Sequence, residues 1–469
     1  MAEDLVVGID VGMSGTGVAY RQKGHAEVIC LKWGIDMKDP KTPTRVFYNV
    51  HDQPPRLVGW GTEVPDDSVE HLKLYEWFKV DLGEVDGDNG QVKSLYRDFL
   101  TSLYGELSTK RFTSALLGGK NFEEAEVLFL FSVPATWDPA AVRDFTQLVR
   151  DSGFEKEGLR SVRVTMTEPQ AVAAYEICVR NPDYQLKDFC LLKMDDTYEK
   201  PPQAMELAPP TACAIGSSYI DRGFEEMVVT YLQEKRDLLL RDIEDDYIVL
   251  AGGLGSSRYV LGKIEEFIGE SQTNLALKTK VVMSSAPRLS VCMGLVYNAG
   301  RNPELFPRRF NRVSVGVASQ SLTGAIKKSR FRNLITRALL RFPKGEKPEG
   351  EVEWFLIKGE LVPDRVAVHE QIAHFSADLP SDKRIWELGI LTSFESDIEQ
   401  LTLEDDFRVH SVLKVKLSHI GEPDQTGARG ALSRLHLARK PKIQIKFDLR
   451  VEVGLATVEI QCSMMTNSV

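Results

Sequence analysis

Short apolar runs alternate with helical patterns from the start of the chain to about residue 300. Residues 5–9 (LVVGI), 26–33 (AEVICLKW) and 126–133 (EVLFLFSV) have the composition of strands, and a helix pattern at 139–149 follows the third. Apolar strands that alternate with amphipathic helices are typical of layered α/β folds. The sequence therefore predicts an α/β fold for this part of the chain.

The pattern changes after about residue 305. Residues 351–362, 407–420 and 442–462 alternate apolar and polar side chains with period two and are rich in Val and Ile. Such alternation is typical of antiparallel strands with one buried face. Because 469 residues exceed what one core normally holds, we expect two domains, 1–304 and a β-rich C-terminal module at 305–469.

Composition excludes several functional classes. Hydrophobic residues make up 43% and charged residues 27% of the chain, which is the balance of a globular protein. A formal charge of −10 argues against a nucleic-acid partner. No run approaches about 18 apolar residues, and the start MAEDLVVGID lacks the features of a signal peptide. We expect a cytoplasmic protein with no membrane association, whose six scattered cysteines are reduced.

The first chemical motif is VVGIDVGMSGTGVAY at residues 6–20. An apolar strand brings Asp10 to its end, and glycines open the turn that follows it. Glycines let backbone N–H groups approach phosphate oxygens, and a nearby carboxylate can hold hydrated Mg²⁺. A plain hairpin, in which the glycines only permit a tight turn, explains the same residues.

The second motif is AGGLGSS at residues 251–257, between a strand pattern and a helix pattern. Paired glycines there permit the close approach of a flat ligand, and the helix N-terminus carries a positive dipole. Turns of this kind are common in α/β proteins. The chain has neither a Walker A loop nor a Rossmann fingerprint.

The order of these motifs is more specific than either one alone. The glycine hairpin is followed by FLFSVPATWDPAAVRDFTQLVRDSGF, then VTMTEPQAVAAYE, then IVLAGGLGSSRYV. This succession resembles the actin, hexokinase and 70-kDa heat-shock ATPases, and most of all the divergent heat-shock branch. TPTRVFY, GWG and EWFKVDLG, within residues 42–83, resemble an atypical subgroup common in fungi. The resemblance implies a two-lobed actin-like ATPase fold with ribonuclease H-like lobes, at about 1–180 and 181–304.

The resemblance also implies ATP and Mg²⁺ as ligands and assigns roles to residues of this chain. Asp10 would organise the hydrated Mg²⁺, Glu168 would hold water or metal, and Lys79 would match the catalytic lysine. A carboxylate at a helix start and a surface lysine are the plain alternatives for Glu168 and Lys79. The backbone of the first turn would bind phosphate through Gly12, Met13 and Ser14, and the second turn would border adenosine through Gly252, Gly253, Gly255 and Ser256.

Two departures from the family pattern suggest a damaged site. The second phosphate loop, expected after the T-E-P-Q helix, is missing, because residues 181–215 contain no glycine. Asp195 and Asp196 lie near its expected start. Only 27 residues separate Phe224 from Gly252, where the family has a helical subdomain. We therefore expect weak or absent Mg-ATP binding, with hydrolysis affected more than binding.

The leading prediction is a heat-shock-like ATP-binding regulator or chaperone relative with weakened or lost hydrolysis, which acts on a protein partner or client. A non-catalytic scaffold that binds a protein partner is the alternative. A small-molecule kinase of the same superfamily is less favoured, because no sugar-kinase signature is present.

Overall fold

The computed structural model forms two compact units. The N-terminal unit contains Met1–Arg309 and Gly454–Thr457, and the C-terminal unit contains Phe310–Val453 and Val458–Val469. The sequence analysis places the domain boundary between residues 304 and 305. The structure describes residues 3–65, 71–82, 89–135, 137, 139–179, 192–194, 204–206, 247–270, 280–299, 305–306, 309–318, 352–362, 366–376, 385–393, 407–416, 442–454 and 458–464.

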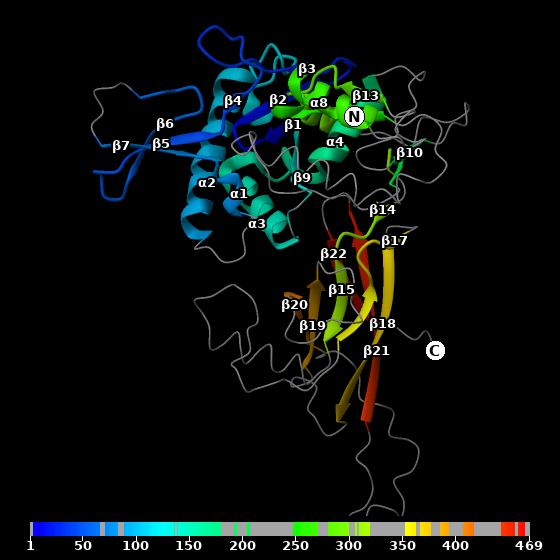
Figure 1. Ribbon diagram of the computed structural model, residues 1–469. Helices are drawn as coiled ribbons and strands as arrows, with labels where there is room; N and C mark the ends of the chain where they lie inside the picture. Colours follow the sequence, from blue (N-terminus) through cyan, green and yellow to red (C-terminus); the bar gives the residue numbers. More distant parts are fainter. Residues whose placement is uncertain are drawn as a thin grey trace, which may run out of the picture. The chain divides into compact units, whose positions relative to one another are not determined.

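The N-terminal unit contains both helices and strands, which confirms the predicted mixed α/β content. The strands of its central sheet are β1 (Leu5–Val11), β2 (Gly15–Gln22), β3 (Ile29–Cys30), β4 (Thr42–Pro43), β8 (Val127–Val133) and β9 (Arg160–Thr167). The order is β3-β2-β1-β8-β9, with β4 also paired to β2 (Figure 1). β1 is antiparallel to β2 and parallel to β8, which is parallel to β9.

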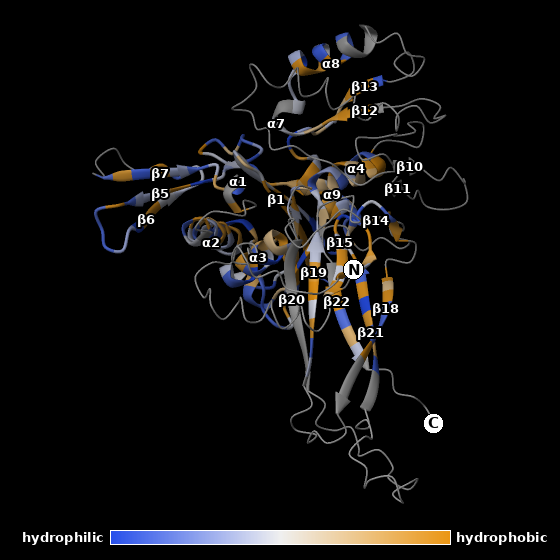
Figure 2. Cartoon of the chain, turned by 60° about the horizontal axis from the view of Figure 1, so that its bottom comes forward, coloured by the Kyte–Doolittle hydropathy of each residue, from blue (hydrophilic) through white to orange (hydrophobic). Residues whose placement is uncertain are grey.

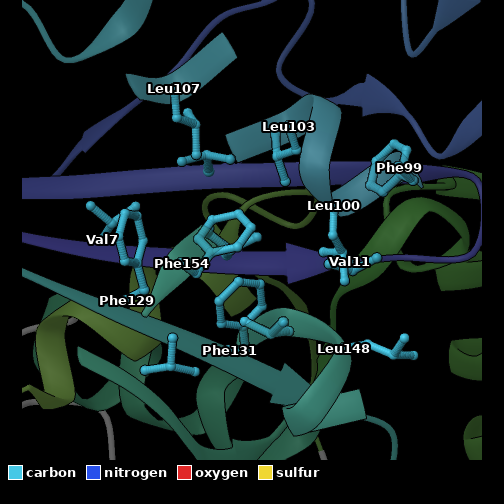
Figure 3. Packing of buried hydrophobic residues seen from close by; sticks show 14 of the residues in the cluster. Val7, Val11, Phe99, Leu100, Leu103, Leu107, Phe129, Phe131, Leu148 and Phe154 are labelled. Atoms are coloured by element: carbon cyan, nitrogen blue, oxygen red, sulfur yellow. The ribbon is translucent and has the colours of Figure 1, made fainter. Parts of the chain in front are cut away.

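Both faces of this sheet are covered by helices. Side chains alternate in direction along a strand, so Val7 and Ile9 of β1 join one hydrophobic cluster and Val6 joins another. Figure 3 shows the first cluster, which contains Phe129 and Phe131 of β8. Burial of one such side chain stabilises the fold by about 1.5–3 kcal/mol. Helices α2 (Asn89–Glu106) and α3 (Pro139–Val149) contribute to the first cluster, and α4 (Glu168–Val179) and α9 (Ser290–Asn298) to the second.

Glycine allows α9 to approach the sheet closely. A Cβ atom placed on Gly8 of β1 would lie 2.3 Å from the carbonyl oxygen of Cys292, which no side chain could tolerate. The loop that precedes α9 and the helix itself therefore lie directly against the hairpin of β1 and β2. Shorter helical turns of this unit are the π-helical turns Leu107–Arg111 and Arg150–Phe154, which continue α2 and α3, and the 3₁₀ turn Phe122–Glu124.

A second sheet leads the chain into a short helix. Its order is β6-β5-β7, with β5 at Arg45–Asn49, β6 at Arg56–Trp60 and β7 at Leu72–Glu76. Trp77, with a positive φ of 59°, lies between β7 and α1 (Lys79–Leu82). Phe78 is buried in the core, where its ring centroid lies 5.0 Å from that of Tyr96.

Parallel strands β12 (Tyr247–Leu250) and β13 (Lys280–Met283) form a further pair in the N-terminal unit. Between them in the sequence lie α7 (Gly252–Gly255) and α8 (Arg258–Glu270), and Figure 2 shows both hydrophilic and hydrophobic residues on α8. Val260 and Ile264 form its buried face. Strands β10 (Leu192–Met194) and β11 (Ala204–Glu206) pair with each other. The remainder of residues 181–246, including Asp195 and Asp196, lies outside the described residues.

The described strands of the C-terminal unit form two larger sheets. One has the order β16-β15-β19-β20 and the other β18-β21-β22. All of the strand pairs within them are antiparallel. Trp386 and Phe447, one from each sheet, stack with ring centroids 4.6 Å apart. The bounds are β15 (Ser314–Ala318), β16 (Val352–Leu356), β18 (Val366–Ser376), β19 (Ile385–Ser393), β20 (Phe407–Lys416), β21 (Lys442–Val453) and β22 (Val458–Met464), and a small sheet pairs β14 (Arg309–Phe310) with β17 (Leu361–Val362).

Candidate functional site

The hairpin of β1 and β2 places a carboxylate beside a glycine turn. Asp10 is 4% exposed, and its carbonyl oxygen accepts a hydrogen bond from the N–H of Gly12 at 3.1 Å. A Cβ atom on Gly12 would lie 2.6 Å from the carbonyl oxygen of Gly15, so the tight turn itself requires glycine there. Met13 and Ser14 complete the turn, and Ser14 is exposed.

Lys41 contacts this carboxylate, and the sequence analysis did not identify it. Its Nζ lies 2.6 Å from Oδ2 of Asp10. A Cβ atom on Gly15 would lie 3.3 Å from the Lys41 Cβ, and one on Gly17 would lie 3.2 Å from its Cε. Gly15 and Gly17 therefore leave room for the lysine side chain. In the sequence, the one feature that distinguishes Lys41 as a candidate site residue is its position directly before the T-P-T segment.

The ion pair keeps Lys41 charged despite its burial. Its side chain is 14% exposed, and removal from water by itself lowers the pKa of the ammonium group. The negative charge of Asp10 and its hydrogen bond outweigh that effect, and the charge of Glu168 adds to them. The net result is a pKa of Lys41 above its usual value. The lysine is thus a fixed cation at neutral pH.

Strand β4 fixes the position of Lys41. Thr42 and Pro43 pair with Thr16 and Gly15 of β2. The hydroxyl groups of Thr16 and Thr44 are 2.9 Å apart in a buried hydrogen bond. These contacts hold the backbone on both sides of the T-P-T segment against the hairpin, so the lysine that precedes it has little freedom to move away.

A second ion pair joins Lys79 to Glu168. The Lys79 Nζ donates to Oε1 of Glu168, although the two residues are 89 positions apart in the chain. Lys79 is 8% exposed, and the side chain of Glu168 is 32% exposed. Lys79 is the first residue of α1, two positions after Trp77 with its positive φ.

The T-E-P-Q sequence has a local structural role in addition to presenting Glu168. The Thr167 N–H and hydroxyl groups donate to Oε1 of Gln170 at 3.0 and 2.9 Å. A side chain three residues into a helix that bonds back to the residue at the N-cap is half of a capping box. This arrangement starts α4 directly after β9. Glu168, in the first turn, is left to contact Lys79.

The residues assigned to adenosine lie at the other glycine turn. Gly252 and Gly253 belong to α7, and Gly252, with a φ of 84°, donates its N–H to the carbonyl oxygen of Pro287. The Ser256 hydroxyl donates to the carbonyl oxygen of Gly253 at 2.6 Å. Gly255 lies against the backbone of Leu250, because a Cβ atom on Gly255 would be 3.0 Å from the Leu250 carbonyl carbon.

One segment contacts both the glycine turn at Gly252 and strand β2 of the hairpin. In the loop that follows β13, the carbonyl oxygen of Pro287 accepts a hydrogen bond from the N–H of Gly252. The chain continues from this loop into α9. There the Cys292 Sγ would lie 3.3 Å from a Cβ atom on Gly17. The buried thiol of Cys292 has a pKa raised by burial and by its hydrogen bond with Cys30. Both of these cysteines are free thiols.

Asp10 and Lys79 thus belong to two ion pairs that also involve Lys41 and Glu168. The roles of Asp10, Lys79 and Glu168 in catalysis, and of the two glycine turns in nucleotide binding, stay predictions. The donor set at Asp10 does not fit a hydrated metal ion, because an ammonium group already contacts one carboxylate oxygen. Among the described residues, no group of three or more His, Cys, Asp and Glu side chains could hold a metal ion.

Comparison with known proteins gives little further information. No family model matches the sequence, and no curated protein matches it. Among solved structures, the chain is similar to the MamK double helical filament, with a TM-score of 0.37 and 14% identity over 64% of this chain and 99% of that one. Likeness of this degree establishes neither fold nor function. No described helix is long and apolar enough to cross a membrane.

Proposed function

We propose that the protein is a nucleotide-binding member of the actin-like ATPase superfamily that binds ATP at the Asp10 hairpin and hydrolyses it slowly or not at all. One observation carries the proposal. Lys79 and Glu168, which the resemblance to heat-shock ATPases assigned to one site from distant parts of the sequence, form an ion pair. The negative charge of Glu168 also helps to raise the pKa of Lys41, which contacts Asp10.

The topology of the central sheet is compatible with this proposal. An antiparallel meander, β1 to β3, is followed by two strands, β8 and β9, that run parallel to β1, with helices on both faces. A ribonuclease H-like lobe requires this arrangement. The second lobe, at about residues 181–304, would include the β12 and β13 pair and the glycine turn at Gly252.

The proposed chemistry is limited to binding and charge neutralisation. Backbone N–H groups of the turn from Gly12 to Ser14 would meet phosphate oxygens, and Lys79 would supply positive charge. Glu168 would orient an attacking water. Hydrolysis needs opposed positive groups around the terminal phosphate. The absence of a second glycine loop from the sequence is therefore expected to impair hydrolysis more than binding.

The finer proposal is that of a heat-shock-like regulator or chaperone relative in the cytoplasm, for which nucleotide binding alters engagement of a protein partner. The antiparallel sheets of the C-terminal unit are the part of the chain that we propose for the partner. The nature of this partner is not specified by any described residue.

A non-catalytic scaffold is a second candidate, and the Lys41 contact favours it. Both carboxylates of the site, Asp10 and Glu168, already have a lysine partner in the protein itself. A site with paired charges is stable without a ligand. In such a protein the ion pairs would only stabilise the N-terminal unit.

Isothermal titration calorimetry of the full chain with ATP distinguishes the two candidates. The nucleotide proposal predicts saturable binding that Lys79→Met weakens at least fivefold. Lys93 is a matched control, because its Nζ pairs with Asp144 at 2.6 Å between α2 and α3, and Lys93→Met should leave the affinity unchanged. Absence of binding heat at millimolar ATP, with the protein folded by circular dichroism, would establish the scaffold instead.

A further inference from the structure

The position of the Lys41 ammonium group has a chemical consequence for the ligand. A carboxylate that organises a hydrated metal must direct its oxygens to the water ligands of that metal. At Asp10 one oxygen instead accepts a 2.6 Å hydrogen bond from Lys41. The cation that Asp10 binds in this structure is therefore part of the protein.

The same ammonium group lies beside the turn assigned to phosphate. The Lys41 Nζ would be 3.7 Å from a Cβ atom on Gly12, the first residue of that turn. An ammonium group has three donor hydrogens, and Asp10 uses one of them. A lysine that contacts the turn with donors to spare can bind phosphate as a point charge.

The surroundings oppose exchange of Lys41 for a metal ion. Its side chain is 14% exposed, and it lies against Gly15 and Gly17. If Lys41 moved out, Asp10, which is 4% exposed, would lose its partner. If it stayed, a divalent ion at Asp10 would be repelled by the ammonium charge at close range.

We propose that Lys41 replaces the divalent metal ion of this site, so that the protein binds a nucleoside triphosphate without Mg²⁺. This inference rests on the proposed nucleotide binding. The triphosphate contacts the Lys41 ammonium directly, and Asp10 serves as a positioning residue that holds Lys41 at the turn. The proposal makes Lys41 a specificity-determining residue, which selects the metal-free form of the nucleotide over its magnesium complex.

Calorimetric titration of the full chain with ATP, once in EDTA and once with excess MgCl₂, tests this directly. The expected result for the natural sequence is a Kd in EDTA that is equal to or lower than the Kd with Mg²⁺. Lys41→Met should raise the Kd in EDTA at least tenfold and make binding dependent on Mg²⁺, since Asp10 is then free. Lys93→Met, the matched lysine variant, should behave as the natural sequence does.

Because Lys41→Met leaves Asp10 unpaired, the double variant Asp10→Asn with Lys41→Met provides a second test in which neither charge of this pair remains. Its Kd for ATP in EDTA should also be at least tenfold higher than that of the natural sequence. Binding by the natural sequence that is at least tenfold tighter with Mg²⁺ than in EDTA would overturn the proposal, as would unchanged affinity of either Lys41 variant. Absence of ATP binding under both conditions would refute the proposed nucleotide function itself, and the inference with it.

Discussion

Gly294 of α9 lies directly against the backbone of Ala171 in α4. A Cβ atom on Gly294 would be 1.7 Å from the carbonyl oxygen of Ala171 and 3.1 Å from the amide nitrogen of Tyr175. Because backbone atoms cannot move aside as a flexible side chain can, the two helices can cross at this distance only with glycine at position 294. α9 also packs against β1, where a Cβ atom on Gly8 would lie 2.3 Å from the carbonyl oxygen of Cys292.

Gly294→Ala is expected to destabilise the protein by about 3 kcal/mol or more, since overpacking at a backbone contact separates the two helices. Gly262 in α8 is the matched control, because a Cβ atom there meets nothing within 4 Å. Gly262→Ala should raise stability by about 0.5–1 kcal/mol through helix propensity. Urea unfolding followed by circular dichroism measures both, and similar midpoints for the two variants would contradict the close crossing.

Lys41→Met is expected to reduce the free energy of unfolding by about 3–5 kcal/mol, because it leaves the buried Asp10 carboxylate without a partner. The double variant Asp10→Asn with Lys41→Met should recover most of that loss. Lys93→Met removes a more exposed pair and should cost much less. Chemical denaturation of the natural sequence, of the single variants Lys41→Met and Asp10→Asn and of the double variant gives the coupling energy of the pair. A double variant no more stable than Lys41→Met would show that the Asp10 charge is not the cause.

Ionisation of the Asp4 carboxylate makes part of the stability of the protein vary with pH in the acid range. The Lys120 ammonium and the Glu126 N–H donate hydrogen bonds to it and hold its pKa below the usual 3.8. A lowered folded-state pKa contributes stability above pH 3.8 that is lost as the pH falls through the folded-state value. Asp4→Asn should therefore lower the Tm at pH 6 and have a progressively smaller effect below pH 4. A difference in Tm that is constant between pH 6 and pH 2.5 would contradict this assignment.

Gly253 allows a separate test of the predicted adenosine turn. It is exposed, and a Cβ atom there meets nothing within 4 Å, so substitution causes no steric strain. Gly253→Asp should weaken ATP binding at least fivefold by charge repulsion, and Gly253→Ala should leave it nearly unchanged. Calorimetry measures both affinities. Equal binding by the two variants would place the nucleotide elsewhere or show that it approaches this turn without its phosphates.

The sequence predicted those features that depend on local pattern. The apolar run at residues 5–9 located β1, which is buried along its whole length, and the glycine turn located the hairpin. The strand expected at 26–33 was too long, because only Ile29 and Cys30 pair with β2. Polar Glu27 and Lys32 flank this pairing, so the apolar run that could extend it is short.

The candidate site was only partly predictable for a different reason. Lys79 and Glu168 belong to segments with a family resemblance, and this made their proximity an expectation before the structure. Lys41 belongs to no motif with known chemistry. Its contact with Asp10 arises from the pairing of β4 with β2, which spans two residues and leaves almost no pattern in the sequence.

The space that Gly15 and Gly17 provide for Lys41 bears on how such hairpins are interpreted in other chains. These glycines satisfy a requirement of the folded protein alone, so selection can preserve them in a lineage that never encounters a phosphate. A genome search for ATPases by this glycine pattern would then collect binders and non-binders together. The residue that precedes the T-P-T segment would divide such chains by the cation at the carboxylate, because a lysine there supplies that cation from the protein itself and a short side chain leaves the carboxylate open to a metal ion.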